Sequence, residues 1–481
     1  MPESNGARGV RSEQPAEVHV TAQRVSDALG EPVLRGSVQA FSGISIDSRT
    51  VGLGELFFAL RGERQDGNAF VARAVEAGAA GVVAAIAPPP DVAGCWWWPA
   101  PEGVAALQRL ALAHRLTMPA RVVCVTGSNG KTSTKELIAA VLATAHAIVR
   151  TPGNLNSQVG LPLSLLRLRP DHAWGVFEVG TSTPGEIATL AAVARPDVGV
   201  ITNVAPSHLE GLSSIEGVIR EKTDLAAALG RRGTLVYGGD GELLRSAVAA
   251  FSCDRVSFGL AESNDVHPTH WELDEGGRPV FDVAGAGEIR LRLVGLPNLL
   301  NALAAIAVGR LAGLAPAQIR RGLESAEPLS LRLEVARAGG VTVIRDCYNA
   351  NPDSMRSGVE TLRSIAGGGT RVAVLGGMRE LGRESEGLHY ALGRELGERP
   401  VDLLLIFGDE AVPLARGYQA TTDAPVHFFR DDAALVRFLG ERVAAPATVL
   451  FKASRGVALD GAARAYLVGL QQAPSNGAGR R

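Results

Sequence analysis

A glycine-punctuated segment between an apolar run and a helical pattern is the feature of this sequence that most constrains its fold. The segment reads VTGSNGKTS and extends from Val125 to Ser133. The apolar residues before it predict a buried strand, and the pattern from Lys135 to Ala145 predicts a helix. A glycine-rich turn that leads from a strand into a helix presents successive backbone N–H groups to an anion. The sequence therefore predicts the phosphate-binding turn of a nucleotide site.

The residues of this turn have separate predicted roles. Gly127 and Gly130 let the backbone approach an anion, while Lys131 supplies a full positive charge. The hydroxyl of Thr132 can bind Mg²⁺, and the pattern G-x-x-x-x-G-K-[ST] is matched except that Val125 replaces its first glycine. A chance Gly-Lys-Thr is the alternative, but the order of strand, glycines, Lys-Thr and helix favours ATP. The predicted nucleotide ligands are Gly127, Ser128, Asn129, Gly130, Lys131, Thr132 and Ser133.

Length and charge limit the remaining possibilities. At 481 residues the chain exceeds the size of a single hydrophobic core, so about two to four domains are expected. Lys and Arg number 48 and Asp and Glu number 50, which gives a net charge of -2. This balance excludes a general basic field that would recruit nucleic acid or an anionic membrane surface.

The cysteines and the termini indicate the compartment. The cysteines are widely spaced and form no C-x-x-C pair, which predicts reduced, structural thiols. The sequence has no apolar run of about eighteen residues, and residues 1–17 lack the apolar part of a signal peptide. We therefore expect a cytoplasmic protein, with residues 1–17 and 471–481 disordered because they lack the hydrophobicity to pack. The cysteines are Cys95, Cys124, Cys253 and Cys347.

Alternating apolar runs and helical patterns predict an α/β fold of three domains. We expect a small α/β N-terminal domain over residues 18–118. A central doubly wound domain with a mostly parallel sheet and the P-loop is expected over 119–327, and a Rossmann-like C-terminal domain over 328–470. The predicted strands of the last two domains are Arg121–Thr126, Trp174–Val179, Val198–Thr202, Thr234–Tyr237, Val341–Asp346, Val372–Gly376, Leu403–Phe407 and Thr448–Lys452.

Three consecutive tryptophans, Trp96 to Trp98, precede Pro99 in the N-terminal domain. We interpret them as the last buried strand of that domain, before a helix from Gly103 to Arg115. A platform on which bases stack is the alternative.

Polar residues end several of the predicted strands. Glu178 ends one strand, Asn203 ends the next, and His208 follows in the adjoining loop. Ligands of open α/β sheets bind outside the carboxyl ends of the strands. Together with Thr132, the carboxylate of Glu178 and the imidazole of His208 form a mixed set that could hold Mg²⁺ with phosphate oxygens and waters. A surface histidine and a salt-bridged glutamate are the alternatives.

Several segments together resemble the Mur ligases over nearly the whole chain. The sequence DCYNANPDSM from Asp346 to Met355 is similar to the branch of that family that adds a dipeptide. The Asp-Asn-Pro-Arg element typical of the branch that adds the third residue is absent from the sequence. The other segments that carry the resemblance are Asp47–Arg49, Gly54–Leu60, Thr126–Thr132, Thr151–Asn156, Glu178–Gly180, Asn203–Gly211, Met378–Gly382 and Lys452–Gly456.

The resemblance implies a stepwise amide synthesis. ATP would phosphorylate the terminal carboxylate of a UDP-N-acetylmuramoyl-tripeptide, and the amine of D-alanyl-D-alanine would attack the acyl phosphate. It further implies ATP and a pair of Mg²⁺ ions as cofactors, a monomer, and no nucleic-acid partner or membrane insertion. The alternatives are another amino-acid ligase of the same fold and a non-catalytic nucleotide-binding relative.

The resemblance also assigns roles beyond the P-loop. Lys222 corresponds to the lysine that relatives carry as a carbamate, and Lys131, Lys222 and His208 form the implied catalytic set. A solvated helix lysine, helix caps and surface pairs are the structural alternatives for these positions and for the next group. The residues expected near the adenine, ribose or phosphates of ATP are Asn298, Asn301, Arg332 and Asp346.

The two other substrates have their own candidate residues. Ser48 and Arg49 are predicted to bind the uridine nucleotide, because a guanidinium suits diphosphate oxygens. Asn154 and Asn156 are expected on the sugar or phosphate side of the same substrate, with turn formation as the alternative. The residues expected to face the dipeptide are Tyr348, Asn349, Asn351, Lys452, Ser454 and Arg455.

Two positions depart from the family pattern. Pro297 precedes Asn298 where relatives usually have His, and Gly377 stands where relatives generally have Asp. Because neither change touches Lys131 or Glu178, we expect altered local contacts and retained chemistry.

Overall fold

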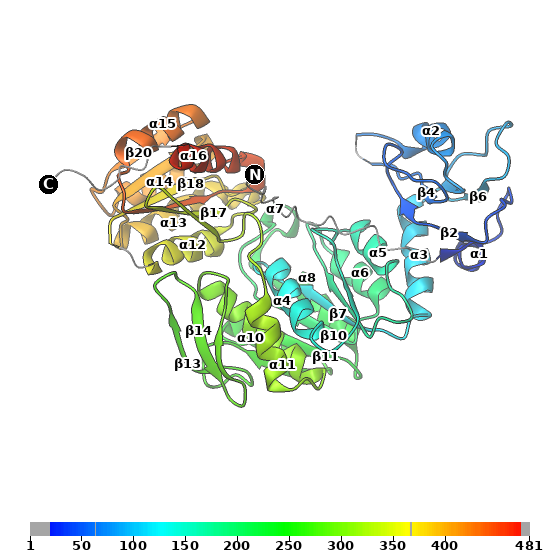
Figure 1. The fold of residues 1–481 in the computed structure, drawn as a ribbon, viewed down its shortest axis with the longest axis horizontal. Helices are drawn as coiled ribbons and strands as arrows, with labels where there is room; N and C mark the ends of the chain where they lie inside the picture. Colours follow the sequence, from blue (N-terminus) through cyan, green and yellow to red (C-terminus); the bar gives the residue numbers. More distant parts are fainter. Residues whose placement is uncertain (1–19, 63, 366–367, 473–481) are drawn as a thin grey trace, which may run out of the picture. The chain divides into compact units, whose positions relative to one another are not determined.

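The computed structural model describes residues 20–62, 64–365 and 368–472. The described residues form two compact units, one within residues 20–120 and 158–172 and one within residues 121–157 and 173–472. The ribbon of each unit can be followed in Figure 1. Of the segments predicted to be disordered, residues 1–17 and residues 473–481 of the tail 471–481 lie outside the described residues. The prediction was wrong for Gln471 and Gln472, which complete the last helix. Within the described residues, no helix has the length and apolar character to cross a membrane.

The first unit is a small α/β domain built on a parallel sheet. Its four strands lie in the order β3-β4-β5-β6, and α5 packs on α3 although α5 comes later in the chain. The strands are β3 (Ile44–Ser45), β4 (Leu56–Phe58), β5 (Gly81–Ala84) and β6 (Trp96–Pro99), beside an antiparallel pair, β1 (Val20–Thr21) and β2 (Ala40–Phe41). The helices are α1 (Ala22–Leu29), α2 (Val71–Glu76), α3 (Gly103–Leu116) and α5 (Gly160–Leu165).

The consecutive tryptophans form strand β6, as the sequence predicts. Trp97 and Trp98 are fully buried, and Trp96 is 8% exposed. Successive side chains of a strand point to opposite faces, so Trp96 and Trp98 share a face and stack with ring centroids 5.4 Å apart. The indole N–H of Trp97 donates to the carbonyl of Ile86 at 3.0 Å. Burial of all three rings rules out the base-stacking alternative.

The central sheet of the second unit is parallel throughout, which confirms the doubly wound prediction. Its six strands lie in the order β12-β11-β10-β7-β9-β8. The connection that leaves β7 leads toward one edge of the sheet, whereas the connection that leaves its neighbour β10 leads toward the other edge. The topological switch point of the sheet therefore lies beside β7, the strand that leads into the P-loop. The strands are β7 (Arg121–Thr126), β8 (Ile148–Arg150), β9 (Trp174–Glu178), β10 (Val198–Ile201), β11 (Thr234–Gly238) and β12 (Asp254–Phe258).

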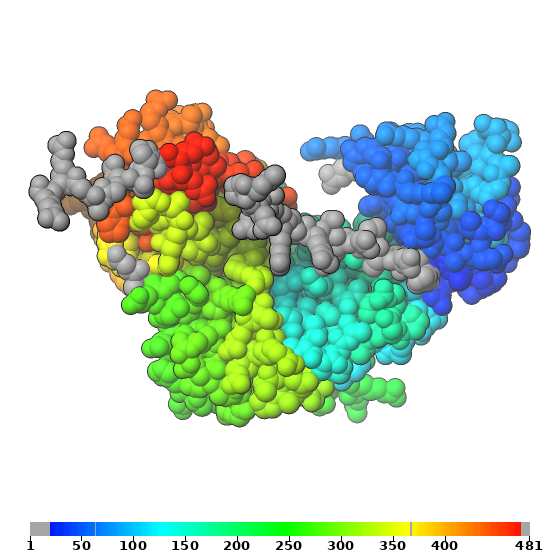
Figure 2. Space-filling model, in the orientation of Figure 1, coloured from blue at the N-terminus to red at the C-terminus, as the bar shows by residue number. Residues whose placement is uncertain are grey.

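Helices cover this sheet and join it to a part of the fold that the sequence patterns do not predict. Helix α4 starts at Lys131 and packs against α10 and α11, whose yellow-green surface is continuous with the cyan surface of α4 in Figure 2. A three-stranded antiparallel sheet buries Phe281 and Ile289 in the same core. The helices are α4 (Lys131–Leu142), α6 (Glu186–Ala194), α7 (Leu209–Leu212), α8 (Ile215–Leu229), α9 (Glu242–Val248), α10 (Leu296–Leu311) and α11 (Pro316–Ser325), and the added strands are β13 (Pro268–Leu273), β14 (Pro279–Val283) and β15 (Gly287–Arg290).

A second α/β sheet completes this unit and confirms the Rossmann-like prediction. Its order is β16-β17-β21-β18-β19-β20, and β16 alone among these strands is antiparallel to its neighbour. Separate apolar cores lie on the two faces, one with α12, α13 and α14 and one with α15 and α16. The strands are β16 (Glu334–Ala338), β17 (Val341–Asp346), β18 (Thr370–Gly376), β19 (Leu403–Phe407), β20 (Val426–Phe429) and β21 (Ala447–Lys452). The helices are α12 (Pro352–Ser364), α13 (Ser385–Glu398), α14 (Val412–Gln419), α15 (Asp432–Arg442) and α16 (Asp460–Gln472).

A buried histidine on α13 makes the stability of this sheet depend on pH. His389 Nε2 accepts a hydrogen bond from the backbone N–H of Met378 at 2.9 Å, and its Nδ1 lies 2.7 Å from the carbonyl of Ser385. Burial holds the pKa of His389 below its ordinary value. As the pH falls below about 6.5, the unfolded chain takes up a proton at this histidine before the folded chain does, so stability falls with decreasing pH.

We expect His389→Gln to reduce the loss of unfolding free energy between about pH 7.5 and about pH 5.5. Glutamine keeps an acceptor for Met378 but does not titrate. The measurement is chemical denaturation at both pH values, with His270→Gln on the exposed part of β13 as the matched control. Equal pH dependence of His389→Gln and the wild type would contradict the assignment.

Candidate functional site

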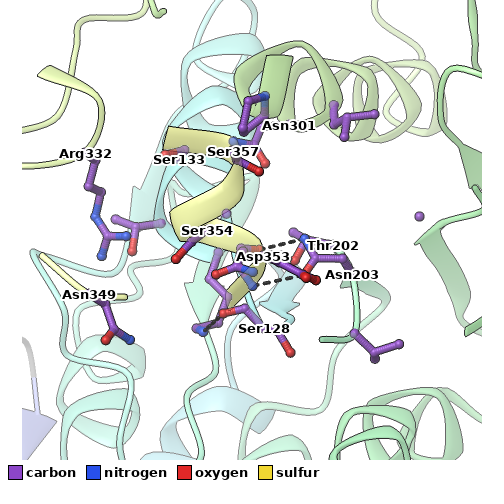
Figure 3. Close-up of a pocket in the computed structure, with 18 of the residues that line it drawn as sticks. Ser128, Ser133, Thr202, Asn203, Asn301, Arg332, Asn349, Asp353, Ser354 and Ser357 are labelled. Atoms are coloured by element: carbon purple, nitrogen blue, oxygen red, sulfur yellow. Dashed lines mark hydrogen bonds between the residues drawn. The ribbon is translucent and has the colours of Figure 1, made fainter. Parts of the chain in front are cut away.

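A cavity of about 770 Å³ lies in the second unit, where the carboxyl ends of the central strands meet the start of α12. Figure 3 shows Ser354 and Ser357 on α12, with Arg332 and Asn349 to one side and Asn203 to the other. The predicted residues that line the cavity are Ser128, Asn129, Gly130, Lys131, Thr132, Ser133, Asn156, Glu178, His208, Asn298, Asn301, Arg332, Asp346, Tyr348, Asn349 and Lys452. The predicted residues that are not part of its lining are Gly127, Asn154, Lys222, Asn351, Ser454, Arg455, Ser48 and Arg49.

The P-loop turn requires glycine at two positions. Gly127 has a φ of 144° and Gly130 a φ of 80°, both in the region that L side chains rarely adopt. A Cβ atom at Gly127 would overlap the hydroxyl of Thr202, and one at Gly130 would overlap the side-chain oxygen of Asn301. Backbone conformation and close packing therefore both select glycine here.

The start of α4 concentrates positive charge. Helix geometry leaves the backbone N–H groups of residues 130–133 without intrahelical acceptors. The Lys131 ammonium donates to the carbonyl of Gly127 at 2.8 Å, which holds it over the turn. Burial lowers the pKa of Lys131, and the negative charge of Glu178 opposes that shift. This arrangement suits an anion with several oxygens.

Thr132, Glu178 and Asn156 form a connected polar group beside this turn. The Thr132 hydroxyl donates to Glu178 Oε2 at 2.7 Å, and Asn156 Nδ2 donates to Glu178 Oε1 at 2.7 Å. Lys135, a fully buried residue that the sequence analysis did not single out, donates to the carbonyls of Thr151 at 2.8 Å and of Gly153 at 3.3 Å. Lys135 thereby holds the loop that carries Asn156. Its position in GKTSTK, one turn after Lys131, is the signal that could have identified it.

The histidine predicted in the metal set has a different partner. His208 lines the cavity, but its Nδ1 lies 2.6 Å from Glu380 Oε2. The close contact with His208 is the main cause that lowers the pKa of Glu380. Backbone N–H of Glu210 also donates to the carbonyl of Glu380 at 3.1 Å. Glu380 belongs to the Met378–Gly382 segment that carries the family resemblance. The sequence does not indicate that His208 is the partner of its carboxylate.

The predicted adenine residues tie α10 to α4. Asn301 Oδ1 accepts from the Thr134 hydroxyl at 3.0 Å, and Asn301 Nδ2 donates to Asn298 Oδ1 at 3.1 Å. Asn298 Nδ2 in turn donates to the carbonyl of Val294 at 2.8 Å. Pro297 lies in the first turn of α10, where a missing N–H costs nothing. The first departure from the family pattern therefore fits the helix that bears these asparagines.

Lys222 is the least compensated charge among these residues. Its side chain is fully buried on α8, and its Nζ has no hydrogen-bond partner among the described residues. Burial lowers the pKa of Lys222 well below its ordinary value, and the charge of Lys131 lowers it further. Burial and the neighbouring charge of Lys131 therefore both disfavour the protonated form of this amine.

The last sheet contributes cations that are already partly paired. Lys452 is 1% exposed and donates to Asp346 Oδ2 at 2.6 Å and to the carbonyl of Asn349 at 3.2 Å. The guanidinium of Arg332 lies 3.8 Å from the ring centroid of Tyr348, and that of Arg455 lies 5.5 Å from it. Such cation–π contacts orient both arginines about one ring.

Two further predicted residues support backbone near this ring. The Ser454 hydroxyl accepts from the backbone N–H of Arg379 at 2.9 Å. Asn351 caps α12, because its Oδ1 accepts from the N–H of Ser354 at 2.9 Å. A Cβ atom at Gly377 would crowd the side chain of Glu410, so an aspartate there would require Glu410 to move. The second departure from the family pattern is thus a packing difference.

In the first unit, the predicted uridine residues lie in one turn. Arg49 pairs with Asp47, with Nη2 2.6 Å from Oδ2, while Ser48 is buried. The hydrogen bonds from Arg49 lower the pKa of Asp47 to about 2. Asp47 therefore orients the Arg49 guanidinium. The sequence places Asp47 two residues before Arg49, but no role was predicted for it.

Comparison with known proteins identifies the family to which this architecture belongs. The chain matches the Mur ligase family, catalytic domain, over residues 40–95, the Mur ligase middle domain over 125–309 and the Mur ligase, glutamate ligase domain over 331–455. It is 34% identical to the UDP-N-acetylmuramoyl-tripeptide–D-alanyl-D-alanine ligase of Bacillus subtilis, over 91% of this chain and 95% of that relative. The chain belongs to the Mur ligase family.

Solved structures of MurF ligases have the same fold as this Mur ligase. The structure of MurF from Acinetobacter baumannii superposes with a TM-score of 0.84 at 29% identity, covering 95% of this chain and all of the other. The MurF ligase of Thermotoga maritima, solved in complex with ADP, gives a TM-score of 0.80 at 28% identity, covering 89% of this chain and 98% of that one. The resemblance stated from the sequence and the three-domain fold are thereby confirmed.

We expect Gly130→Ala to destabilise this Mur ligase more than Gly185→Ala. Gly130 and Gly185 both precede helices, with φ of 80° and 83° and ψ of -4° and -1°, so both variants carry a left-handed backbone cost of about 1–2 kcal/mol. Gly185 has open space around its Cβ position, whereas an alanine at 130 meets Asn301. The added overlap should cost about 1–3 kcal/mol more. Thermal unfolding measures the difference, and equal melting temperatures would contradict the packing argument.

Proposed function

We propose that this Mur ligase joins D-alanyl-D-alanine to UDP-N-acetylmuramoyl-tripeptide at the expense of ATP, to give the UDP-linked pentapeptide precursor of peptidoglycan. The observation that carries the proposal is that the P-loop and residues of the Asp346–Met355 segment line one cavity. The relatives that bear this activity in their names align over nearly the whole chain. A single cavity that takes a nucleotide on one wall and an acceptor on the other is what such a reaction requires.

The nucleotide occupies the P-loop side of the cavity in this proposal. Its phosphates lie against the start of α4, where Lys131 and the free N–H groups offset their charge. Asn298 and Asn301 border the adenine, while Arg332 and Asp346 reach the ribose or the phosphates. Phosphoryl transfer between two anions needs this neutralisation and positioning more than covalent help from the protein.

The residues beside the P-loop fit Mg²⁺. A hydroxyl and a carboxylate lie together at Thr132 and Glu178, and both are oxygen ligands of the kind Mg²⁺ prefers. Within the described residues no cluster of three or more His, Cys, Asp or Glu could hold a metal alone, which suits an ion that shares phosphate oxygens and waters. Bound there, Mg²⁺ would neutralise developing charge on the phosphates. His208 joins this set only by leaving Glu380.

The reaction proceeds in two balanced steps. An oxygen of the tripeptide carboxylate attacks the γ-phosphorus, the bond to ADP breaks, and an acyl phosphate forms. The dipeptide amine then attacks the acyl carbon and forms the amide bond, the carbon–oxygen bond to phosphate breaks so that inorganic phosphate leaves with its electron pair, and the amine loses one proton. Tyr348, Asn349 and Lys452 line the cavity and are proposed to bound the dipeptide end of the site. Asn351, Ser454 and Arg455 lie outside that lining and are proposed to support this end.

We assign the uridine diphosphate to Ser48 and Arg49 in the first unit, and the sugar or phosphate side of the same substrate to Asn154 and Asn156. The exposed guanidinium of Arg49, oriented by Asp47, supports the first assignment. The proposal places a monomeric enzyme in the cytoplasm, which the buried free cysteines support.

Lys222 is proposed to carry a carbamate. In its unprotonated form, which burial favours, the amine would attack the carbon of CO₂, form a nitrogen–carbon bond and release one proton to solvent. The resulting negative charge would lie near Lys131, whose positive charge now disfavours protonation of Lys222. A buried lysine without a hydrogen-bond partner becomes a compensated anion by this change.

The function is tested by phosphate release from ATP with Mg²⁺ and UDP-N-acetylmuramoyl-tripeptide, using tripeptides that end in lysine or diaminopimelate. We expect release only when D-alanyl-D-alanine is also present, with a pentapeptide product by mass. Lys131→Met should reduce turnover at least about a hundredfold, because the ammonium acts on transition-state charge. Turnover with a single amino acid would move the chain to another ligase of the family, and no turnover with any acceptor would overturn the proposal.

The carbamate is tested by ¹³C NMR after equilibration with ¹³C-bicarbonate. We expect a carbamate signal in the wild type that is lost in Lys222→Gln, and activity that falls in bicarbonate-free buffer and returns on addition of bicarbonate. Lys135→Gln is the matched control, because Lys135 is equally buried but already donates to carbonyl oxygens. A signal that persists in Lys222→Gln, or none in the wild type, would exclude the modification.

A further inference from the structure

Two asparagine side chains, one from the P-loop in the cavity lining and one just outside that lining, pair reciprocally. Asn129 Nδ2 donates to Asn351 Oδ1 at 3.2 Å, and Asn351 Nδ2 donates to Asn129 Oδ1 at 2.8 Å. Asn129 belongs to the P-loop, and Asn351 precedes α12 of the last sheet, 222 residues later. We call this contact the amide pair.

Each member of the amide pair is fixed on its own side. The backbone N–H of Asn129 donates to Asn203 Oδ1 at 3.0 Å, and its carbonyl accepts from the hydroxyl of Thr202 at 2.6 Å. Asn351 is 4% exposed, and its backbone N–H donates to the Ser354 hydroxyl at 3.0 Å. The amide pair therefore joins two backbone segments that are each anchored on their own side.

The chemistry at Asn351 exceeds what helix capping needs. Its Oδ1 caps α12 by accepting from the N–H of Ser354. Serine and aspartate cap helices about as well as asparagine, so a cap alone does not call for an amide nitrogen. That nitrogen donates to Asn129. The amide of Asn351 is thus accounted for by the P-loop contact.

We propose that Asn351 is a positioning residue that couples the P-loop to the acceptor side of the cavity. Tyr348 and Asn349 immediately precede it and line that side. An anion that orders the P-loop favours the amide pair, and the amide pair favours the arrangement of the segment that meets the acceptor. The identity of the acceptor, D-alanyl-D-alanine, rests on the proposed function. The effect of Asn351 on nucleotide binding does not depend on that function.

Reciprocity makes this coupling measurable. If acceptor binding tightens nucleotide binding, then nucleotide must tighten acceptor binding by the same factor. Loss of the amide pair should remove that factor without unfolding α12. A residue whose only role is to cap α12 would change stability and leave the ratio unchanged.

The first test uses ADP alone and does not depend on the acceptor. We expect Asn351→Ser and Asn129→Ser each to raise the dissociation constant of ADP by roughly fivefold in calorimetry. The double variant should bind ADP no more weakly than either single variant, because both break the same contact. Additive effects of the two substitutions would overturn the proposal.

A matched cap replacement separates coupling from stability. Asp431 caps α15 by accepting from the N–H of Ala434 at 2.8 Å and lies outside the cavity lining. Asp431→Ser should therefore lower the melting temperature by a small amount and leave ADP affinity unchanged, whereas Asn351→Ser also removes the amide pair and should lower both. Asn351→Asp, which keeps the cap but loses the donor to Asn129, should reproduce the effect of Asn351→Ser on ADP. Wild-type ADP affinity in Asn351→Asp would overturn the proposal.

The second test measures the coupling itself. We expect D-alanyl-D-alanine to lower the dissociation constant of ADP in the wild type, and this ratio to fall to about one in Asn351→Ser. In turnover, the variant should raise KM for the dipeptide more than it lowers kcat. An unchanged ratio in the variant would overturn the coupling. A wild type that binds ADP but no dipeptide would refute the proposed function, while the ADP-only result would still decide whether the amide pair acts on the P-loop.

Discussion

The close packing of the P-loop against its neighbours is the constraint on which the rest of the second unit depends. The turn leaves no room for a Cβ atom at Gly127 or Gly130, because Thr202 and Asn301 occupy that space. Thr202 follows β10, and Asn301 lies on α10, so one turn fixes the end of a neighbouring strand and the approach of a later helix. The contacts that shape the anion-binding turn are therefore also contacts of the packed core. For this reason the turn can hold its conformation before any ligand binds.

Buried lysines show where this unit tolerates charge and where it does not. Lys135 and Lys452 are almost fully buried, but backbone carbonyls or a carboxylate satisfy both ammonium groups. Lys222 is buried without such a partner among the described residues, beside the charge of Lys131. An isolated buried charge is costly unless it is paired or neutralised. A negative charge between Lys131 and Lys222 would accordingly offset this unfavourable positive charge, whether it comes from a phosphate group or from a modified lysine.

The sequence predicts the elements whose signals are local and leaves out the contacts that are not. Strands β7, β17 and β19 occur at the predicted residues because an apolar run defines each one. The antiparallel strands β13 to β15 were missed because their outer faces are polar and their turns interrupt any long pattern. Pairs such as Asn129 with Asn351, or His208 with Glu380, join residues far apart in the chain, and nothing in either local sequence specifies its partner.

The linker that carries Arg332 shows how the last sheet controls one wall of the cavity. Leu331 and Leu333 have φ of 59° and 50°, a conformation that costs bulky residues about 1–3 kcal/mol each. The N–H of Leu331 donates to Glu334 at 2.9 Å, and the N–H of Leu333 donates to Asp346 at 3.3 Å. These acceptors lie in β16 and β17, so the linker is held by the sheet it enters. Arg332 must therefore move with that sheet, and its place over Tyr348 is set by the same rigid body that bears Asn351.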